Sequence, residues 1–144
     1  MKTHEKQSIV EANGVLGRSF FAAQDRLRGG PAPELCAPQY RAQLNANPPI
    51  DRAGHEQFSR DFYAGFLDLR HEIEQVIAAE DAVVVRFVLH GMHTGPVFGI
   101  PATHKRVAIP AHVILRVQGG KVNELFGIFD QAGMLTQLGV LPAA

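Results

Sequence analysis

The feature that most constrains this chain is the alternation of apolar and polar residues through most of its second half. From Arg70 onward the hydrophobic pattern has a period of two residues, which indicates β-strands because successive strand side chains point to opposite faces. Glu80-Asp81 and Gly119-Gly120 predict tight turns, and residues 95–105, rich in proline and glycine, predict a longer connection. The strands are predicted over residues 71–79, 82–94, 106–118 and 121–130. This half of the chain therefore predicts an antiparallel meander.

The first half of the chain has a helical pattern instead. Apolar residues at three- and four-residue steps predict a helix over residues 7–28, in which Gly14 and Gly17 favour a kink or close packing. A second helix is predicted over residues 52–67, and residues 40–44 between the helices predict an edge strand. Helices followed by an antiparallel meander are typical of an α+β domain with the helices packed on one face of the sheet.

Composition excludes several classes of partner. The 144 residues (1–144) predict a single domain, and their formal net charge of zero favours neither nucleic acid nor an anionic membrane. No apolar run is long enough to span a membrane, and no secretory signal precedes the first helix. Cys36 is the only cysteine, so no intrachain disulfide can form. We expect a cytoplasmic protein with no membrane or nucleic-acid partner.

Strand parity predicts two different sheet faces. In residues 106–118 one face is wholly apolar and should contact the helices. The opposite face of the sheet mixes apolar side chains with Arg86 from residues 82–94 and with His112 and Arg116 from residues 106–118. This face is too hydrophobic for a free surface. This second face therefore predicts a homodimer interface.

Asp130 is the first candidate for chemistry, because it directly follows the apolar run Phe126–Phe129. A carboxyl group beside an apolar pocket suits proton transfer near neutral pH. The alternative is that Asp130 caps the following helical turn, since aspartate is a favoured N-cap. The two roles are compatible, because one oxygen can cap while the other faces the pocket.

Two histidines are further candidates. His93 falls on the apolar face by parity, so it is either a hydrogen-bonded core residue or a catalytic donor. His112 falls on the opposite face unless Pro110 introduces a bulge that reverses it. His90 and His93 are three residues apart and so point to opposite faces, which predicts no metal site. No cofactor-binding motif is present in the sequence, so we expect no cofactor.

Three blocks of the sequence resemble a known family. They are Asp68-Leu69-Arg70, the stretch Gly91-x-His93-Thr94-Gly95-x-x-Phe98-Gly99-Ile100-Pro101-Ala102-Thr103-x-Lys105, and the carboxyl-terminal stretch Gly120-Lys121-Val122-x-Glu124-x-Phe126, Asp130 and Gly133-Met134-Leu135-x-Gln137-Leu138-Gly139. In this order, over roughly residues 55–141, they resemble the SnoaL-like polyketide cyclase (ester cyclase) family.

The resemblance implies a cone-shaped α+β barrel of the nuclear-transport-factor-2-like type, in which the helices pack on the concave face of a strongly curved antiparallel sheet around an apolar pocket. It implies that Asp130 is the general acid/base, and that relatives dimerise through the sheet. The chain departs from the family where Ala42-Gln43 replaces a pocket histidine after Tyr40, where Leu67 replaces a proline, and where His104 replaces a glycine.

Together, these observations predict cofactor-independent acid/base catalysis on a small hydrophobic carbonyl compound. The resemblance specifies an intramolecular aldol-type cyclisation of a polyketide-like substrate, with Asp130 as acid/base and His93 or His112 as hydrogen-bond donor. The alternatives are an isomerase or hydrolase on the same fold, or a non-catalytic dimeric module that binds a small molecule. The residues predicted to contact the substrate are Phe20, Phe58, Phe62, Phe66, Tyr40, Met92, Phe126 and Leu115.

Overall fold

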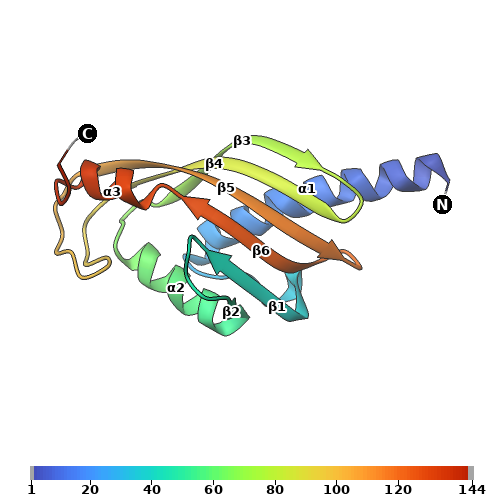
Figure 1. The fold of residues 1–144 in the computed structure, drawn as a ribbon, viewed down its shortest axis with the longest axis horizontal. Helices are drawn as coiled ribbons and strands as arrows, with labels where there is room; N and C mark the ends of the chain where they lie inside the picture. The colour runs from blue at the N-terminus through green and yellow to red at the C-terminus, as the bar shows by residue number, and fades with distance from the viewer. Residues whose placement is uncertain (1, 143–144) are drawn as a thin grey trace.

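The computed structural model describes residues 2–142, which form helices and strands in the predicted order (Figure 1). The elements are α1 (Thr3–Leu27), the 3₁₀ turn η1 (Pro33–Leu35), β1 (Cys36–Leu44), β2 (Ile50–Asp51), α2 (Arg52–Ala64), β3 (Arg70–Ala78), β4 (Ala82–Met92), β5 (Arg106–Gln118), β6 (Lys121–Phe129) and α3 (Gln131–Gln137). The α+β class is confirmed, and each predicted strand and helix is present with its bounds shifted by a few residues.

The strands form one mixed sheet in the order β2-β1-β6-β5-β4-β3. β3 through β6 are the predicted antiparallel meander, but β1 pairs with β6 in parallel. The parallel pairing of β1 departs from the predicted antiparallel pattern, and residues 40–44 are not the edge strand that was predicted. β1 lies between β6 and the two-residue β2, so its backbone is paired on both sides, and the sheet is curved but not closed (Figure 1).

The turn between β5 and β6 shows why two glycines are required there. Gly119 and Gly120 have φ angles of 58° and 74°, which side-chain-bearing residues adopt only with strain. The predicted tight turn is therefore confirmed. Pro110 introduces no bulge, because the β4–β5 register runs without a break from Ala82↔Arg116 to Met92↔Arg106.

Helix α1 packs against β3 and β4 (Figure 1). Its buried residues include Leu16, Phe20 and Ala23, which belong to the predicted apolar stripe, and also Phe21. Gly17 faces Val83 so closely that a methyl group at Gly17 would lie 2.8 Å from Cγ1 of Val83. The glycine therefore allows the helix to approach the sheet. Within residues 2–142, no helix combines the length and the apolar character that crossing a membrane requires.

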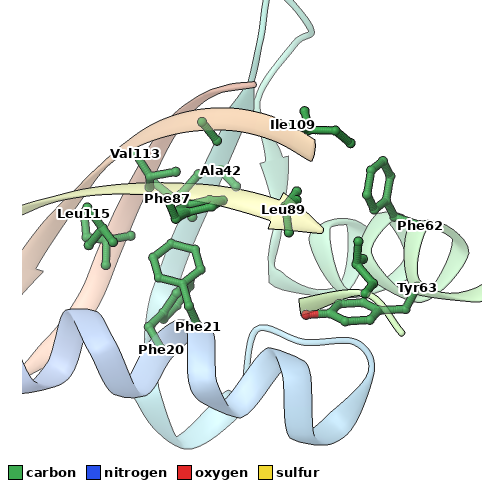
Figure 2. Packing of buried hydrophobic residues seen from close by; sticks show 14 of the residues in the cluster. Phe20, Phe21, Ala42, Phe62, Tyr63, Phe87, Leu89, Ile109, Val113 and Leu115 are labelled. Carbon is green, nitrogen blue, oxygen red and sulfur yellow. The ribbon is translucent and has the colours of Figure 1, made fainter. Parts of the chain in front are cut away.

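The hydrophobic core lies between the helices and the inner face of the sheet (Figure 2). Phe21 of α1 packs on Phe87 of β4 with ring centroids 4.8 Å apart. In Figure 2, Phe62 and Tyr63 of α2 lie beside Leu89 and Ile109 at one end of this core. A cavity between α2, the end of α1 and the middle strands holds the candidate site.

Candidate active site in the apolar cavity

Asp130 lies outside the apolar interior. Its Oδ1 accepts a hydrogen bond from the backbone N–H of Gly133 at 2.8 Å, so the carboxylate is the N-cap of α3. The residue is exposed and lines an open groove at the end of β6. The capping geometry turns the side chain toward this open groove and away from the enclosed cavity described below, and the acid/base role of Asp130 stays a prediction. The alternative prediction, a helix cap, describes its position.

The two predicted histidines also lie away from the apolar cavity described below. His112 is exposed on the outer sheet face, opposite Arg86 and Ile128 in the register, and shares the open groove with Asp130. His93 is fully buried on the inner face, where its Nδ1 accepts a hydrogen bond from the backbone N–H of Thr103 at 3.1 Å. Its ring packs against Phe66 with centroids 5.5 Å apart. His93 is therefore a core residue that is hydrogen-bonded through Nδ1, while its Nε2 is buried without a hydrogen-bond partner among the described residues.

The predicted substrate contacts fall into three groups. Phe58 and Phe62 line the apolar cavity. Phe20, Phe66 and Leu115 are buried in the core and do not line it, although Tyr40 contacts the cavity-lining residue His55. Met92 and Phe126 point to the outer sheet face, so their prediction as pocket residues is wrong. Alternation along β4 and β6 explains this, since the inward positions are Gly91 and Leu125.

The cavity itself lies between α1, α2 and the inner face of the sheet and encloses about 80 Å³. The cavity is partly open to solvent. Phe58 and Phe62 also border a neighbouring depression beneath Phe98. The lining is mostly apolar: Phe21, Leu44, Phe58, Phe62, Leu69, Phe87, Leu89, Ala111, Val113, Leu125, Gly127, Ile128 and Phe129. The polar residues in the lining are Gln24, His55, Ser59, Tyr63 and His71.

His71 forms a dyad with a carboxylate that comes from the end of α1. Its Nδ1 lies 2.8 Å from Oδ1 of Asp25, and its backbone N–H donates to Oδ2 of Asp25 at 3.0 Å. The imidazole is 6% exposed and is held between Phe21 and Phe87, with ring centroids 5.0 and 4.7 Å away. Because Nδ1 donates to the carboxylate, the Nε2 atom carries the free lone pair.

Tyr63 completes this network from α2. Its hydroxyl donates to Oδ1 of Asp25 at 2.7 Å. The guanidinium of Arg28, one helical turn after Asp25 on the chain, donates to the carbonyl oxygens of Tyr63, Phe66 and Leu67. These bonds satisfy carbonyl groups at the end of α2 and join it to the end of α1. The end of α1, which carries Asp25, and the end of α2, which carries Tyr63, are therefore fixed relative to each other.

The electrostatics favour an ionised Asp25. Burial raises the pKa of Asp25, but the hydrogen bonds and charge of His71 and the hydrogen bond from Tyr63 outweigh it, so the pKa is below its usual value. Burial also raises the pKa of Tyr63, and the adjacent Asp25 carboxylate raises it further. Tyr63 therefore stays a protonated donor, and Asp25 stays an acceptor that can stabilise a positive charge on His71.

A second histidine lines the cavity from α2. His55 is 4% exposed, and its Nδ1 lies 2.8 Å from the hydroxyl of Tyr40 on β1. Burial lowers the pKa of His55 to about 4, so this imidazole is neutral near pH 7. The backbone N–H of Gly54 donates to Oδ1 of the N-cap residue Asp51 at 2.8 Å, which fixes the start of the helix that carries His55. The cavity therefore holds one histidine beside a carboxylate and one without.

Asp25, His55 and His71 were not among the predicted site residues, although the sequence carries a signal for each. Asp25 follows Phe21 by four residues on the buried side of α1. His55, Ser59 and Tyr63 recur at four-residue steps on the buried face of α2. His71 shares the inward parity of Ile73 on β3, where a polar residue is unexpected. Polar residues on apolar faces were the available signal.

Comparison with known proteins agrees with this fold. The model of the SnoaL-like polyketide cyclases matches residues 18–138. The chain therefore belongs to the SnoaL-like polyketide cyclase family. No curated protein sequence matches the chain.

Solved structures show the same architecture. AclR from Streptomyces galilaeus, a proposed hydroxylase, is 25% identical with a TM-score of 0.82, over 94% of this chain and 85% of AclR. A proposed SnoaL-like polyketide cyclase from Jannaschia sp. CCS1 is 24% identical with a TM-score of 0.79, over 99% of both chains. IdmH from Streptomyces antibioticus, a proposed polyketide cyclase, is 25% identical with a TM-score of 0.72, over 92% of this chain and 99% of IdmH. The fold is thus of the nuclear-transport-factor-2-like type.

Proposed function

We propose that this protein is an enzyme that catalyses proton transfer on a hydrophobic carbonyl compound, with His71 as the general base and Asp25 as its partner. The observation that carries the proposal is the 2.8 Å contact between Nδ1 of His71 and the Asp25 carboxylate at the wall of an apolar cavity. Imidazole exchanges a proton readily near neutral pH, and a carboxylate on one nitrogen strengthens the other as a base.

The reaction proposed is an intramolecular aldol-type closure, supported by the family and by the cyclase name of IdmH. Nε2 of His71 removes a proton from a carbon α to a carbonyl group. The electron pair of the resulting enolate forms a bond to a second carbonyl carbon of the same molecule. The imidazolium, stabilised by Asp25, then returns its proton to the alkoxide oxygen, so no cofactor takes part. The apolar walls keep the substrate folded and exclude water.

The size of the cavity bears on the substrate. A typical site for a drug-sized ligand encloses roughly 300–1,000 Å³, whereas this cavity encloses about 80 Å³. Phe58 and Phe62 border both the cavity and the adjacent depression, and the ring centroid of Phe58 lies 6.2 Å from that of Phe98, which also lines the depression. Entry of a compound with two or more rings therefore requires these side chains to move, which would join the two spaces.

The proposal is tested by deuterium exchange into 2-tetralone, a bicyclic ketone with acidic α-protons, followed by NMR in D₂O. We expect the protein to accelerate exchange over buffer and His71→Gln to lose about 10²-fold or more of that acceleration. His4→Gln, at an exposed position in α1, is the matched control and should exchange at the rate of the unmodified protein. Binding of 2-tetralone without accelerated exchange would instead indicate a non-catalytic carrier.

We also propose that the outer sheet face forms a homodimer interface. Ile114 and Phe126 are register partners on this face and are 44% and 40% exposed, with Ile128 beside them. The formal net charge of zero offers little repulsion between copies. Light scattering on the protein as it elutes from a size-exclusion column should give the mass of a dimer. Phe126→Glu should give the mass of a monomer, with an unchanged circular dichroism spectrum. A monomeric unmodified protein would rule the interface out.

A further inference from the structure

We propose that His55, oriented by Tyr40, donates a hydrogen bond from Nε2 to the carbonyl oxygen of the substrate and to the enolate oxygen that forms from it. This inference rests on the proposed function, because it assigns the donor that complements the base His71. It also narrows the substrate class to compounds that present an oxygen acceptor to α2 while their acidic carbon faces β3.

The hydrogen bond between Tyr40 and His55 can run in only one favourable direction. Both side chains are buried, and their rings are nearly parallel, with an interplanar angle of 5° and Nδ1 2.8 Å from the hydroxyl oxygen. Among residues 2–142, the Tyr40 hydroxyl has no other hydrogen-bond partner. If Nδ1 donated, the hydroxyl hydrogen would be buried without an acceptor, which is unfavourable. Tyr40 therefore donates to Nδ1.

The protonation state of Tyr40 supports this direction. Burial, with a smaller contribution from the nearby Cys36, raises the pKa of Tyr40 well above its usual value. The phenol consequently keeps its hydrogen at every pH at which the protein would be used. Because Nδ1 accepts that hydrogen, the neutral imidazole of His55 must carry its own hydrogen on Nε2.

His55 lines the cavity, and within the described residues its Nε2 makes no hydrogen bond. Nε2 of His55 is not fully buried, so a ligand or water in the cavity can accept its hydrogen. The carbonyl oxygen of a bound substrate is such an acceptor, and its hydrogen bond strengthens as negative charge develops.

The two histidines of the cavity differ in the group that contacts Nδ1. Asp25 accepts from Nδ1 of His71 and leaves Nε2 of His71 as a proton acceptor. Tyr40 donates to Nδ1 of His55 and leaves Nε2 of His55 as a proton donor. Burial alone accounts for the lowered pKa of His55, and no neighbouring charge stabilises its imidazolium form. Two histidines in one cavity are thus set in opposite tautomers, one as base and one as hydrogen-bond donor.

The test has two parts, and the first observes the tautomer directly. In ¹⁵N-labelled protein at pH 7, imidazole spectra should show the hydrogen of His55 on Nε2. Tyr40→Phe should mix the two tautomers, because the ring remains and only the hydroxyl is lost. A purely structural role for Tyr40 would leave the tautomer unchanged. A hydrogen on Nδ1 in the unmodified protein would overturn the proposal.

The second part measures recognition of the carbonyl group. We expect 2-tetralone to bind more tightly than tetralin, which lacks the oxygen, and its ¹³C-labelled carbonyl carbon to shift downfield on binding. His55→Phe should reduce the preference for 2-tetralone about tenfold and abolish the shift, while His4→Phe, at an exposed position, should change neither. Unchanged preference and shift in His55→Phe would overturn the proposal. If His55→Phe does not fold, the carbonyl shift in Tyr40→Phe decides, since an undiminished shift contradicts the assignment.

Failure of the proposed function gives a different result. His71→Gln should keep the downfield carbonyl shift while it loses deuterium exchange. If the protein shows the His55-dependent carbonyl shift but does not accelerate exchange, the assignment of His55 as hydrogen-bond donor stands and the assignment of His71 as catalytic base is contradicted.

Discussion

The imidazole of His71 and the carboxylate of Asp25 lie 46 residues apart in the chain, yet their Nδ1 and Oδ1 atoms are 2.8 Å apart. The contact joins the last turn of α1 to the first residues of β3. Asp25 also accepts from Tyr63 of α2, so one carboxylate links both main helices to the sheet beside the cavity. A polar contact of this kind would be an expensive way to stabilise an apolar core, whereas it is suited to orienting a base.

The first prediction concerns Asp25→Asn. An amide can donate to Nδ1 of His71, which would move the imidazole hydrogen to Nε2 and remove the free lone pair. We expect the acceleration of 2-tetralone exchange to fall by about 10²-fold or more, while circular dichroism shows a folded protein. Exchange at the unmodified rate in folded Asp25→Asn would show that the carboxylate does not set the tautomer.

The second prediction concerns acid stability. His55 has a pKa of about 4 in the folded protein and about 6.5 when unfolded, so the unfolded chain binds more protons between these values. The stability that the neutral imidazole contributes is present above pH 6.5 and is lost as the pH falls toward 4, by about 3 kcal/mol. Urea unfolding between pH 4 and 7 should show this loss. His55→Gln should flatten the curve over this window, and an equally steep curve would contradict the assignment.

The third prediction uses two glycines of α1 as a matched pair. Gly17→Ala would place a methyl group 2.8 Å from Val83, whereas at Gly14 the nearest atom, Cβ of Ala78, would be 3.8 Å away. We expect Gly14→Ala to raise the free energy of unfolding by about 0.5–1 kcal/mol through helix propensity. Gly17→Ala should lower it by roughly 1 kcal/mol or more, because overpacking exceeds that gain. Urea unfolding measures both, and equal effects would contradict the close helix–sheet contact.

The fold was predictable because its signals are local. Alternation along residues 106–118 and the pair Gly119-Gly120 determine the strands and their turn over short distances, and the structure confirms them. The parallel pairing of β1 with β6 was not predictable, since no local pattern in residues 36–44 distinguishes an edge strand from an inserted one. Register between strands distant in sequence depends on how the helices cover the sheet.

The site was harder to predict for the same reason. Asp130 combines a local signal for capping with a family motif, and only the structure shows that its side chain caps α3 and is exposed to solvent. Asp25 and His71 carry no motif, and their proximity depends on how α1 crosses β3 and β4. A search for polar residues at apolar helix and strand positions would have found them.

The most direct test of the account compares Asp130→Asn with His71→Gln in the 2-tetralone exchange assay. Asparagine caps a helix as well as aspartate does, so Asp130→Asn should fold normally. We predict that Asp130→Asn exchanges within about twofold of the unmodified protein, because the residue lies outside the cavity. His71→Gln should lose about 10²-fold or more. The reverse result, with Asp130→Asn inactive and His71→Gln active, would contradict the account.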